Sequence, residues 1–144
     1  MSDALIVVCP HCAASNRVPA SRLDEGGTCG KCKQPLFDGH PVELTGGNFD
    51  AHVGRSGLPL VVDFWAPWCG PCRSMAPAFE AAARSLEPQV RLAKLNTENE
   101  PQLAQGFGIR SIPTLAIFKG GREIVRQAGA MDEGSLVRWI KSHI

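Results

Sequence analysis

The chain has 144 residues, 44% of them hydrophobic, and a formal net charge of +1 at pH 7. This length suits one domain of ordinary size with a small appendage, and the hydrophobic content is sufficient for a packed core. The near-neutral charge excludes a whole-chain attraction to nucleic acid or to an anionic membrane surface. The apolar stretch 4–8 is too short for a transmembrane helix or a signal-peptide core, so we expect a cytoplasmic protein without a membrane partner.

The first 37 residues contain few large apolar side chains and many turn-forming residues, so this segment cannot fold on hydrophobic burial alone. It holds two Cys-x-x-Cys pairs whose spacing fits a zinc-binding pattern. The four cysteines are Cys9, Cys12, Cys29 and Cys32. Two tight turns would each present two thiolates to one tetrahedral Zn²⁺, and metal binding would supply the missing folding free energy. We therefore predict a four-cysteine zinc ribbon over residues 1–37.

Other interpretations of these cysteines remain open. Cys9-Pro10-His11-Cys12 has the same central dipeptide as some strongly oxidising periplasmic enzymes, but no amphipathic helix follows it. Two structural disulfides are disfavoured by a reducing cytoplasm. His11 could replace one cysteine as a metal ligand, although four thiols are available. Lys31 and Lys33 form only a thin basic patch, so we expect no nucleic-acid partner.

From residue 38 onward, the pattern changes to alternating strands and helices. Apolar runs predict strands at 41–44, 58–65, 90–95, 113–118 and 123–126. A short helix capped by Asn48 and carrying Phe49 and Val53 is predicted after the first strand. Helical spacing predicts further helices at 71–86, kinked by Pro77, and after 99–101, and Asp132 is expected to cap a last helix. The order β-α-β-α-β-α-β-β-α implies an α/β fold, with a mostly parallel central sheet flanked by helices.

The second predicted strand leads directly into Trp68-Cys69-Gly70-Pro71-Cys72. A strand that opens onto Cys-x-x-Cys and then a helix places one thiol at a helix N-terminus, where the dipole and free N–H groups favour a thiolate. We expect Cys69 to be the accessible nucleophile and Cys72, one turn into the helix, to be the less exposed resolving thiol. Asp63 lies inside the apolar strand, where a buried carboxylate is costly unless it is paired or protonated.

Residues 41–144 resemble the thioredoxin family over their whole length. The matching residues are Val61-Val62-Asp63-Phe64-Trp65-Ala66, Trp68-Cys69-Gly70-Pro71-Cys72, Ala76-Pro77, Ala93-Lys94-Leu95-Asn96 and Ile109-Arg110-Ser111-Ile112-Pro113-Thr114. The resemblance implies a thioredoxin domain over 38–144 and a protein-disulfide reductase that works through a redox disulfide between Cys69 and Cys72.

The same resemblance implies roles for residues around the dithiol. Asp63 would lie behind Cys72 and assist its proton transfer, and Lys94 on a neighbouring strand would pair with Asp63. The Ile112–Pro113 bond would be cis and leave the backbone of Ile112 free to pair with an extended substrate. The family places Trp65 and Trp68 near the dithiol. The residues expected to contact partners are Trp68, Gly70, Pro71, Ile112, Pro113 and Gly129, the last on an apolar patch with Ala66 and Pro71.

The whole chain is similar to the zinc-ribbon-bearing thioredoxin 2 type, in which the zinc module modulates redox behaviour. This implies disulfide-containing protein substrates and regeneration by an NADPH-dependent flavoprotein, thioredoxin reductase. The chain has no Gly-x-Gly-x-x-Gly loop, so we expect it to bind neither NADPH nor flavin itself. We expect a monomer. Two alternatives remain open: an oxidase or isomerase of protein disulfides, disfavoured by Gly70-Pro71, and a redox-switched chaperone or binding protein that releases zinc.

Overall fold

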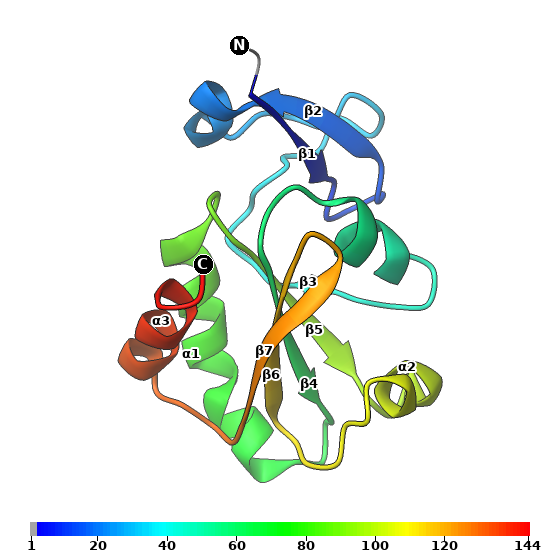
Figure 1. Cartoon of the computed structure of the whole chain (residues 1–144), viewed down its shortest axis with the longest axis vertical. Helices are drawn as coiled ribbons and strands as arrows, with labels where there is room; N and C mark the ends of the chain where they lie inside the picture. The colour runs from blue at the N-terminus through cyan, green and yellow to red at the C-terminus, as the bar shows by residue number, and fades with distance from the viewer. Residues whose placement is uncertain (1–2) are drawn as a thin grey trace.

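The strands form a two-stranded sheet and a separate five-stranded sheet in the computed structural model, which describes residues 3–144. The small sheet pairs β1 (Ala4–Val8) antiparallel with β2 (Ser15–Pro19), and a 3₁₀ helix, η1 (Ala20–Glu25), follows. These elements belong to residues 3–37, called the ribbon below. Figure 1 shows the ribbon in blue at one end of the molecule, above the C-terminal part formed by residues 38–144.

The five-stranded sheet has the order β3-β5-β4-β6-β7. Its strands are β3 (Val42–Glu43), β4 (Leu60–Trp65), β5 (Arg91–Asn96), β6 (Thr114–Lys119) and β7 (Arg122–Ala128). The pairings of β5 with β3 and with β4 are parallel, whereas β6 pairs antiparallel with β4 and with β7. The sheet is therefore mixed, with two parallel and two antiparallel pairings, so it is less parallel than expected, whereas its elements follow the order predicted from the sequence.

Helices cover both faces of this sheet (Figure 1). They are the π-helical turn η2 (Ala51–Arg55), α1 (Gly70–Leu86), α2 (Pro101–Gly106) and α3 (Glu133–Lys141). On one face, α1 and α3 bury a cluster that includes Phe79, Leu136 and Ile140, and on the other face Phe49, Phe64, Phe107 and Phe118 pack against one another. The alternation of side chains along β4 sends Val61 and Asp63 to the face that α1 covers and Val62 and Phe64 to the other.

The start of the last helix, α3, is as predicted, whereas the start of the short helix η2 is not. The Asp132 carboxylate accepts the N–H of Ser135 at 2.8 Å and caps α3. Asn48 does not cap the short helix: its side chain accepts the N–H of Thr45 at 2.7 Å and donates to the carbonyl of Glu43 at 2.9 Å. Asn48 therefore fixes the turn after β3, because its amide reaches back to the strand rather than forward to η2. Phe49 is still buried, as the sequence indicates.

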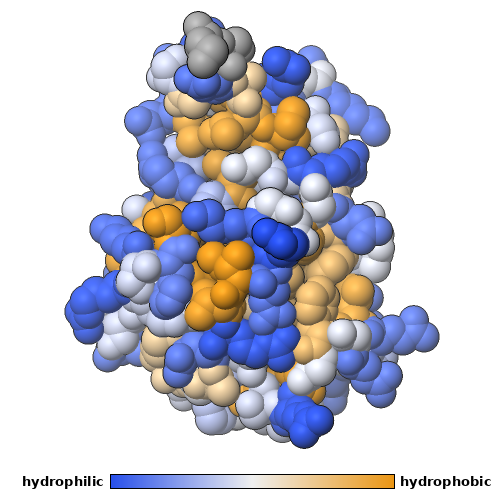
Figure 2. Space-filling view, viewed as in Figure 1, coloured by the Kyte–Doolittle hydropathy of each residue, from blue (hydrophilic) through white to orange (hydrophobic). Residues whose placement is uncertain are grey.

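The surface of the molecule alternates between polar and apolar residues. Figure 2 shows an apolar area over the ribbon near β1, whose first three residues are only partly buried. Within residues 3–144, no helix combines the length and the apolar character that a membrane span requires.

Candidate dithiol and metal sites

Cys69 and Cys72 are joined by a disulfide at the N-terminus of α1, with their Cα atoms 5.2 Å apart. Cys69 is the N-cap residue of the helix, and its sulfur accepts the backbone N–H of Cys72 at 3.2 Å. Pro71 occupies the first turn, where the N–H that proline lacks would have no helical partner. The strand, the tight turn and the helix start therefore place one cysteine sulfur where the helix can stabilise negative charge.

A groove with a volume of about 520 Å³ runs beside this disulfide. Its lining residues are Trp68, Cys69, Pro71, Thr97, Ala104, Ile109, Arg110, Ser111 and Ile112. Cys69 is among them and Cys72 is not, which separates the two cysteines as the sequence predicts. The exposure of Cys69 is nevertheless smaller than expected, at 4% against 2% for Cys72. The reason is that both cysteines pack with Ala66 beneath Trp65 and Ile112.

The loop before β6 forms one wall of the groove. The peptide bond between Ile112 and Pro113 is cis, and the Ile112 carbonyl oxygen lies 3.7 Å from the sulfur of Cys69. Pro113 itself is buried, so the partly exposed Ile112 provides the groove surface. Gly129 lies next to this loop, because its N–H donates to the carbonyl of Pro113 at 2.9 Å. Its φ of +99° is a conformation that glycine adopts readily.

The predicted apolar surface patch of Ala66, Pro71 and Gly129 is wrong for Ala66, which does not reach the surface. Ala66 is fully buried beneath the disulfide, because it follows the central strand β4 directly, whereas Pro71 and Gly129 are exposed. Among residues 3–144, Trp68 is instead the most exposed of the large hydrophobic residues, with 64% of the residue exposed. Its indole N–H donates to the carboxylate of Glu98 at 2.6 Å. Glu98 therefore fixes the orientation of this tryptophan, although nothing in the sequence around Glu98 signals that role.

Asp63 is buried in β4, 1% exposed, and within residues 3–144 neither carboxylate oxygen has a hydrogen-bond partner. Burial raises the pKa of Asp63 to about 7, and the positive charge of Lys94 opposes part of that rise. The predicted pairing of Lys94 with Asp63 is wrong. The two residues are neighbours in the register of β4 and β5, but the Lys94 ammonium lies 4.2 Å from the centre of the Trp65 ring. The long lysine side chain follows the indole face, which attracts cations, and not the carboxylate.

The four ribbon cysteines meet in space, with their sulfur atoms all within 4.8 Å of one another. The sulfurs of Cys9 and Cys32 are 3.6 Å apart, and those of Cys12 and Cys29 are also 3.6 Å apart. Four sulfurs that each lie about 2.3 Å from a tetrahedral Zn²⁺ are separated by about 3.8 Å. The arrangement therefore has the size of a tetrahedral metal site, and the separations are too long for disulfides.

Two similar turns build this cluster. The carbonyl of Cys9 accepts the N–H of Ala13 at 3.0 Å, and the carbonyl of Cys29 accepts the N–H of Lys33 at 3.0 Å. Each turn also directs a backbone N–H at the sulfur of its first cysteine, from His11 at 3.3 Å and from Lys31 at 3.4 Å. Such N–H groups stabilise the negative charge of metal-bound thiolates.

Asn16 connects the first half of the ribbon to the second turn. Its side-chain oxygen accepts the N–H of Gly30 at 2.9 Å, and its amide nitrogen lies 3.5 Å from the sulfur of Cys29. This role could not be predicted, since an asparagine in a strand does not indicate a metal site. Groups that hydrogen-bond a ligand atom orient it and tune the metal.

His11 is not part of the cysteine cluster and pairs instead with the Asp38 carboxylate at 3.4 Å.

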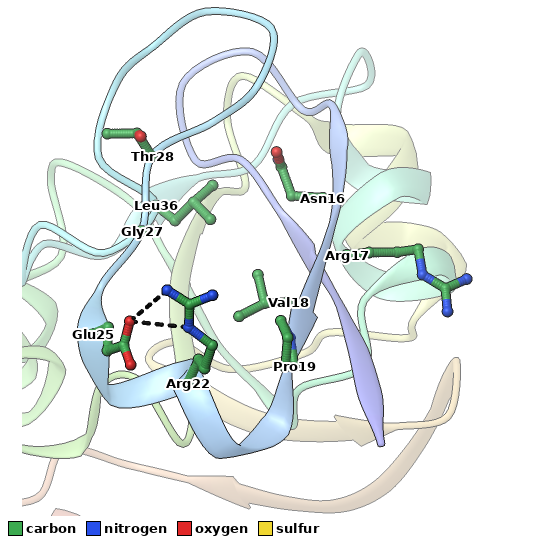
Figure 3. A pocket seen from close by; sticks show the side chains of 9 residues that line it. All are labelled: Asn16, Arg17, Val18, Pro19, Arg22, Glu25, Gly27, Thr28 and Leu36. Carbon is green, nitrogen blue, oxygen red and sulfur yellow. Dashed lines mark hydrogen bonds and ion pairs between the residues drawn. The ribbon is translucent and has the colours of Figure 1, made fainter. Parts of the chain in front are cut away.

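A hollow of about 200 Å³ also lies in the ribbon, between β2, η1 and the segment around Leu36, and none of the four cysteines lines it. Figure 3 shows the Arg22 guanidinium bound to Glu25 there, whereas the side chain of Arg17 extends away. The charged groups of this hollow are thus paired or directed outward.

Comparisons with known proteins match both parts of the chain. The family model described as Thioredoxin matches residues 40–142, and the zinc-ribbon model described as Thioredoxin 2, N-terminal matches residues 8–34. Thioredoxin C-3 of Corynebacterium nephridii is 41% identical over 140 residues, which are 97% of this chain and 96% of that protein. Thioredoxin 1 of a Nostoc species is 43% identical over 103 residues, 72% of this chain and 96% of that protein.

Proposed function

The chain belongs to the thioredoxin family, and we propose that Cys69 and Cys72 carry out its thiol–disulfide exchange on protein substrates. The thiolate of Cys69 attacks one sulfur of a partner disulfide, which forms a mixed disulfide and releases one partner thiolate. Cys72 then loses its proton and attacks the sulfur of Cys69, which releases the second partner thiolate. Two electrons and two protons pass to the partner, and the chain is left with the Cys69–Cys72 disulfide described above.

The assignment of Cys69 as the attacking residue depends on its place in the groove. Cys69 lines the groove and caps α1, whereas Cys72 does not line it. The backbone N–H of Cys72 points at the Cys69 sulfur and favours its ionised form. This geometry is the observation that carries the proposal, because an exchange reaction needs one ionised sulfur within reach of a foreign disulfide.

Asp63 is proposed to take the proton of Cys72. A carboxyl group with a pKa of about 7 exchanges protons readily near neutral pH. The carboxyl lies on the sheet face that α1 covers, and α1 carries Cys72. Lys94 modulates this acid through its charge, because it lowers the pKa of Asp63 without a direct ion pair.

The walls of the groove are proposed to hold an extended segment of the partner. Trp68 and Pro71 offer exposed apolar surface, and Ile112 precedes the start of β6, so its backbone lies outside the sheet pairing. An extended chain can form main-chain hydrogen bonds with such a segment. Gly70, Pro113 and Gly129 complete the proposed contact surface around the dithiol.

The ribbon is proposed to bind one Zn²⁺ through Cys9, Cys12, Cys29 and Cys32, with a structural or regulatory role. Four sulfurs at tetrahedral spacing and the match of residues 8–34 to a zinc-ribbon family support this ion. We place the boundary between the ribbon and the thioredoxin domain at residues 37 and 38. The ion would neutralise the mutual repulsion of four thiolates and hold the two turns together.

Membership of the family supports reduction by a flavoprotein thioredoxin reductase that would bind the same face as the substrates, with the chain acting as a monomer. A cytoplasmic location is proposed because a reducing compartment preserves a dithiol and a metal-bound cysteine cluster.

The proposal is tested by the reduction of a model protein disulfide with the Cys69→Ser variant and with a Cys9→Ser, Cys12→Ser double variant. We expect the first to abolish turnover and the second to retain most of it. The reverse pattern would favour a redox-switched binding protein, a candidate that the partial exposure of Cys12 and Cys32 supports. A metal and thiol count on the same samples separates loss of the ion from loss of the dithiol.

A further inference from the structure

Arg91 lies buried between the ribbon and the C-terminal part, with 2% of the residue exposed. Its guanidinium donates to the carbonyl oxygens of Val8 at 3.2 Å and Leu36 at 2.8 Å and forms an ion pair with Glu87 at 3.0 Å. It also lies 4.6 Å from the centre of the Phe37 ring. A buried charge is tolerated only when its hydrogen-bonding groups are satisfied, so each of these contacts matters.

The two carbonyl groups that hold Arg91 lie next to the metal site in the chain. Val8 directly precedes the ligand Cys9, and Leu36 follows the turn that ends at Cys32. The N–H of Leu36 donates to the carbonyl of Gly27 at 3.1 Å, and its side chain packs in the same buried cluster as Cys9 and Cys29. The position of both acceptors therefore depends on the ribbon being folded around its four cysteines.

The other side of Arg91 is fixed in the central sheet. Arg91 is the first residue of β5, its N–H donates to the carbonyl of Pro59 at 2.9 Å, and it is paired in register with Leu60 of β4. Its ion-pair partner Glu87 accepts a further hydrogen bond, from the N–H of Gly39 at 2.9 Å. The side chain thus connects a rigid strand to two ribbon carbonyls.

We propose that Arg91 couples metal binding in the ribbon to the stability of the C-terminal part. The inference rests on the proposed zinc site. A ribbon without its ion cannot hold its small core together, so Arg91 would lose two acceptors and its aromatic cover while remaining buried. Energetic coupling is reciprocal: the ion stabilises the C-terminal part through Arg91, and Arg91 in turn slows loss of the ion.

The three tryptophans make the coupling measurable in the intact chain. Trp65, Trp68 and Trp139 all belong to the C-terminal part, and residues 1–37 contain no tryptophan. Thermal unfolding followed by tryptophan fluorescence therefore reports on that part, with the chain either loaded with Zn²⁺ or stripped by a chelator. We expect stripping to lower the Tm of the wild-type chain by several degrees and to lower that of Arg91→Met by less than half as much.

Gln89→Ala is the control, since it removes a different side-chain hydrogen bond between the two parts, from Gln89 to Asp24 at 2.9 Å, in an exposed position. It should keep the full Zn²⁺-dependent shift. Phe37→Leu removes the aromatic ring that covers the Arg91 guanidinium from the ribbon side, so it should reduce the Zn²⁺-dependent shift in Tm. This variant replaces Arg91→Met in the test if Arg91→Met does not fold. A second measurement is the rate of Zn²⁺ transfer to a coloured chelator, expected to be at least threefold faster in Arg91→Met than in the wild type or in Gln89→Ala.

Equal shifts in the wild type and Arg91→Met, or no shift in a wild-type chain shown to bind one Zn²⁺, would overturn the coupling and leave the zinc site intact. A chain that binds no Zn²⁺ at all would overturn both.

Discussion

The buried carboxyl of Asp63 should make the oxidised protein less stable as the pH rises, and Asp63→Asn should remove that effect. Burial raises the pKa of Asp63 from its ordinary value of 3.8 to about 7. One pKa unit corresponds to about 1.4 kcal/mol, so the charged form costs roughly 4 kcal/mol of folding free energy when fully ionised. An asparagine of the same shape does not carry this cost.

The sign follows from the direction of the shift. The folded state holds the proton more tightly than the unfolded state, so between about pH 4 and pH 7 it binds more protons, and stability falls as the pH rises through that window. For Asp63 alone, the free energy of unfolding should be roughly 2.5 kcal/mol lower at pH 8 than at pH 5.

Urea unfolding of the oxidised chain at constant Zn²⁺, followed by tryptophan fluorescence at pH 5 and pH 8, measures this difference. Asp63→Asn should be more stable than the wild type at both values, with the larger gain at pH 8. Asp50→Asn removes the same charge from an exposed position and serves as the control. A gain from Asp63→Asn that is independent of pH, or larger at pH 5, would refute the reasoning.

Three further predictions concern other residues. Asn16→Ala should speed loss of metal to a chelator several-fold, because the second cysteine turn loses its side-chain contacts to Gly30 and Cys29; an unchanged rate would contradict this role. Asp132→Ala should lower the free energy of unfolding by about 1 kcal/mol in urea, and Asp132→Asn, which can still cap α3, should lower it less. Trp68→Ala should reduce kcat/KM for a protein disulfide more than for a small disulfide, because its exposed ring contributes contact surface and not chemistry; equal losses would count against this.

Much of the architecture could be predicted because the local signals agree with the fold. The apolar run before Cys69 is the central strand, and the spacing of Met75, Phe79, Ala82 and Leu86 marks the face of α1 that is buried. Asp132 caps its helix because a following N–H lies within reach of its carboxylate. Asn48 has the same capping chemistry in the sequence, but its side-chain oxygen accepts the N–H of Thr45 and its amide nitrogen donates to the carbonyl of Glu43, so neither atom is directed at η2.

The contacts of long side chains could not be predicted from the sequence. Register places Lys94 opposite Asp63, yet the aromatic face of Trp65 determines where the ammonium lies. The roles of Asn16 and Arg91 depend on residues far away in the chain, and neither residue type in a strand indicates a metal site or a buried contact. The low exposure of Cys69 likewise could not be predicted, because the residue that covers it, Ile112, lies far away in the sequence.

The short segment before β4 has a practical consequence for anyone who divides this protein. Leu58 is buried with the ribbon's own apolar residues, and the N–H of Gly57 donates to the carbonyl of Ile6 at 2.8 Å. The segment therefore belongs to the core of the ribbon, although it lies beyond residue 37 in the sequence. A fragment beginning at residue 38 would present Leu58 and the guanidinium of Arg91 to solvent and invite self-association during expression. A fragment ending at residue 37 would lack the leucine that closes its interior, so chimaeras and truncations should carry this stretch with both halves.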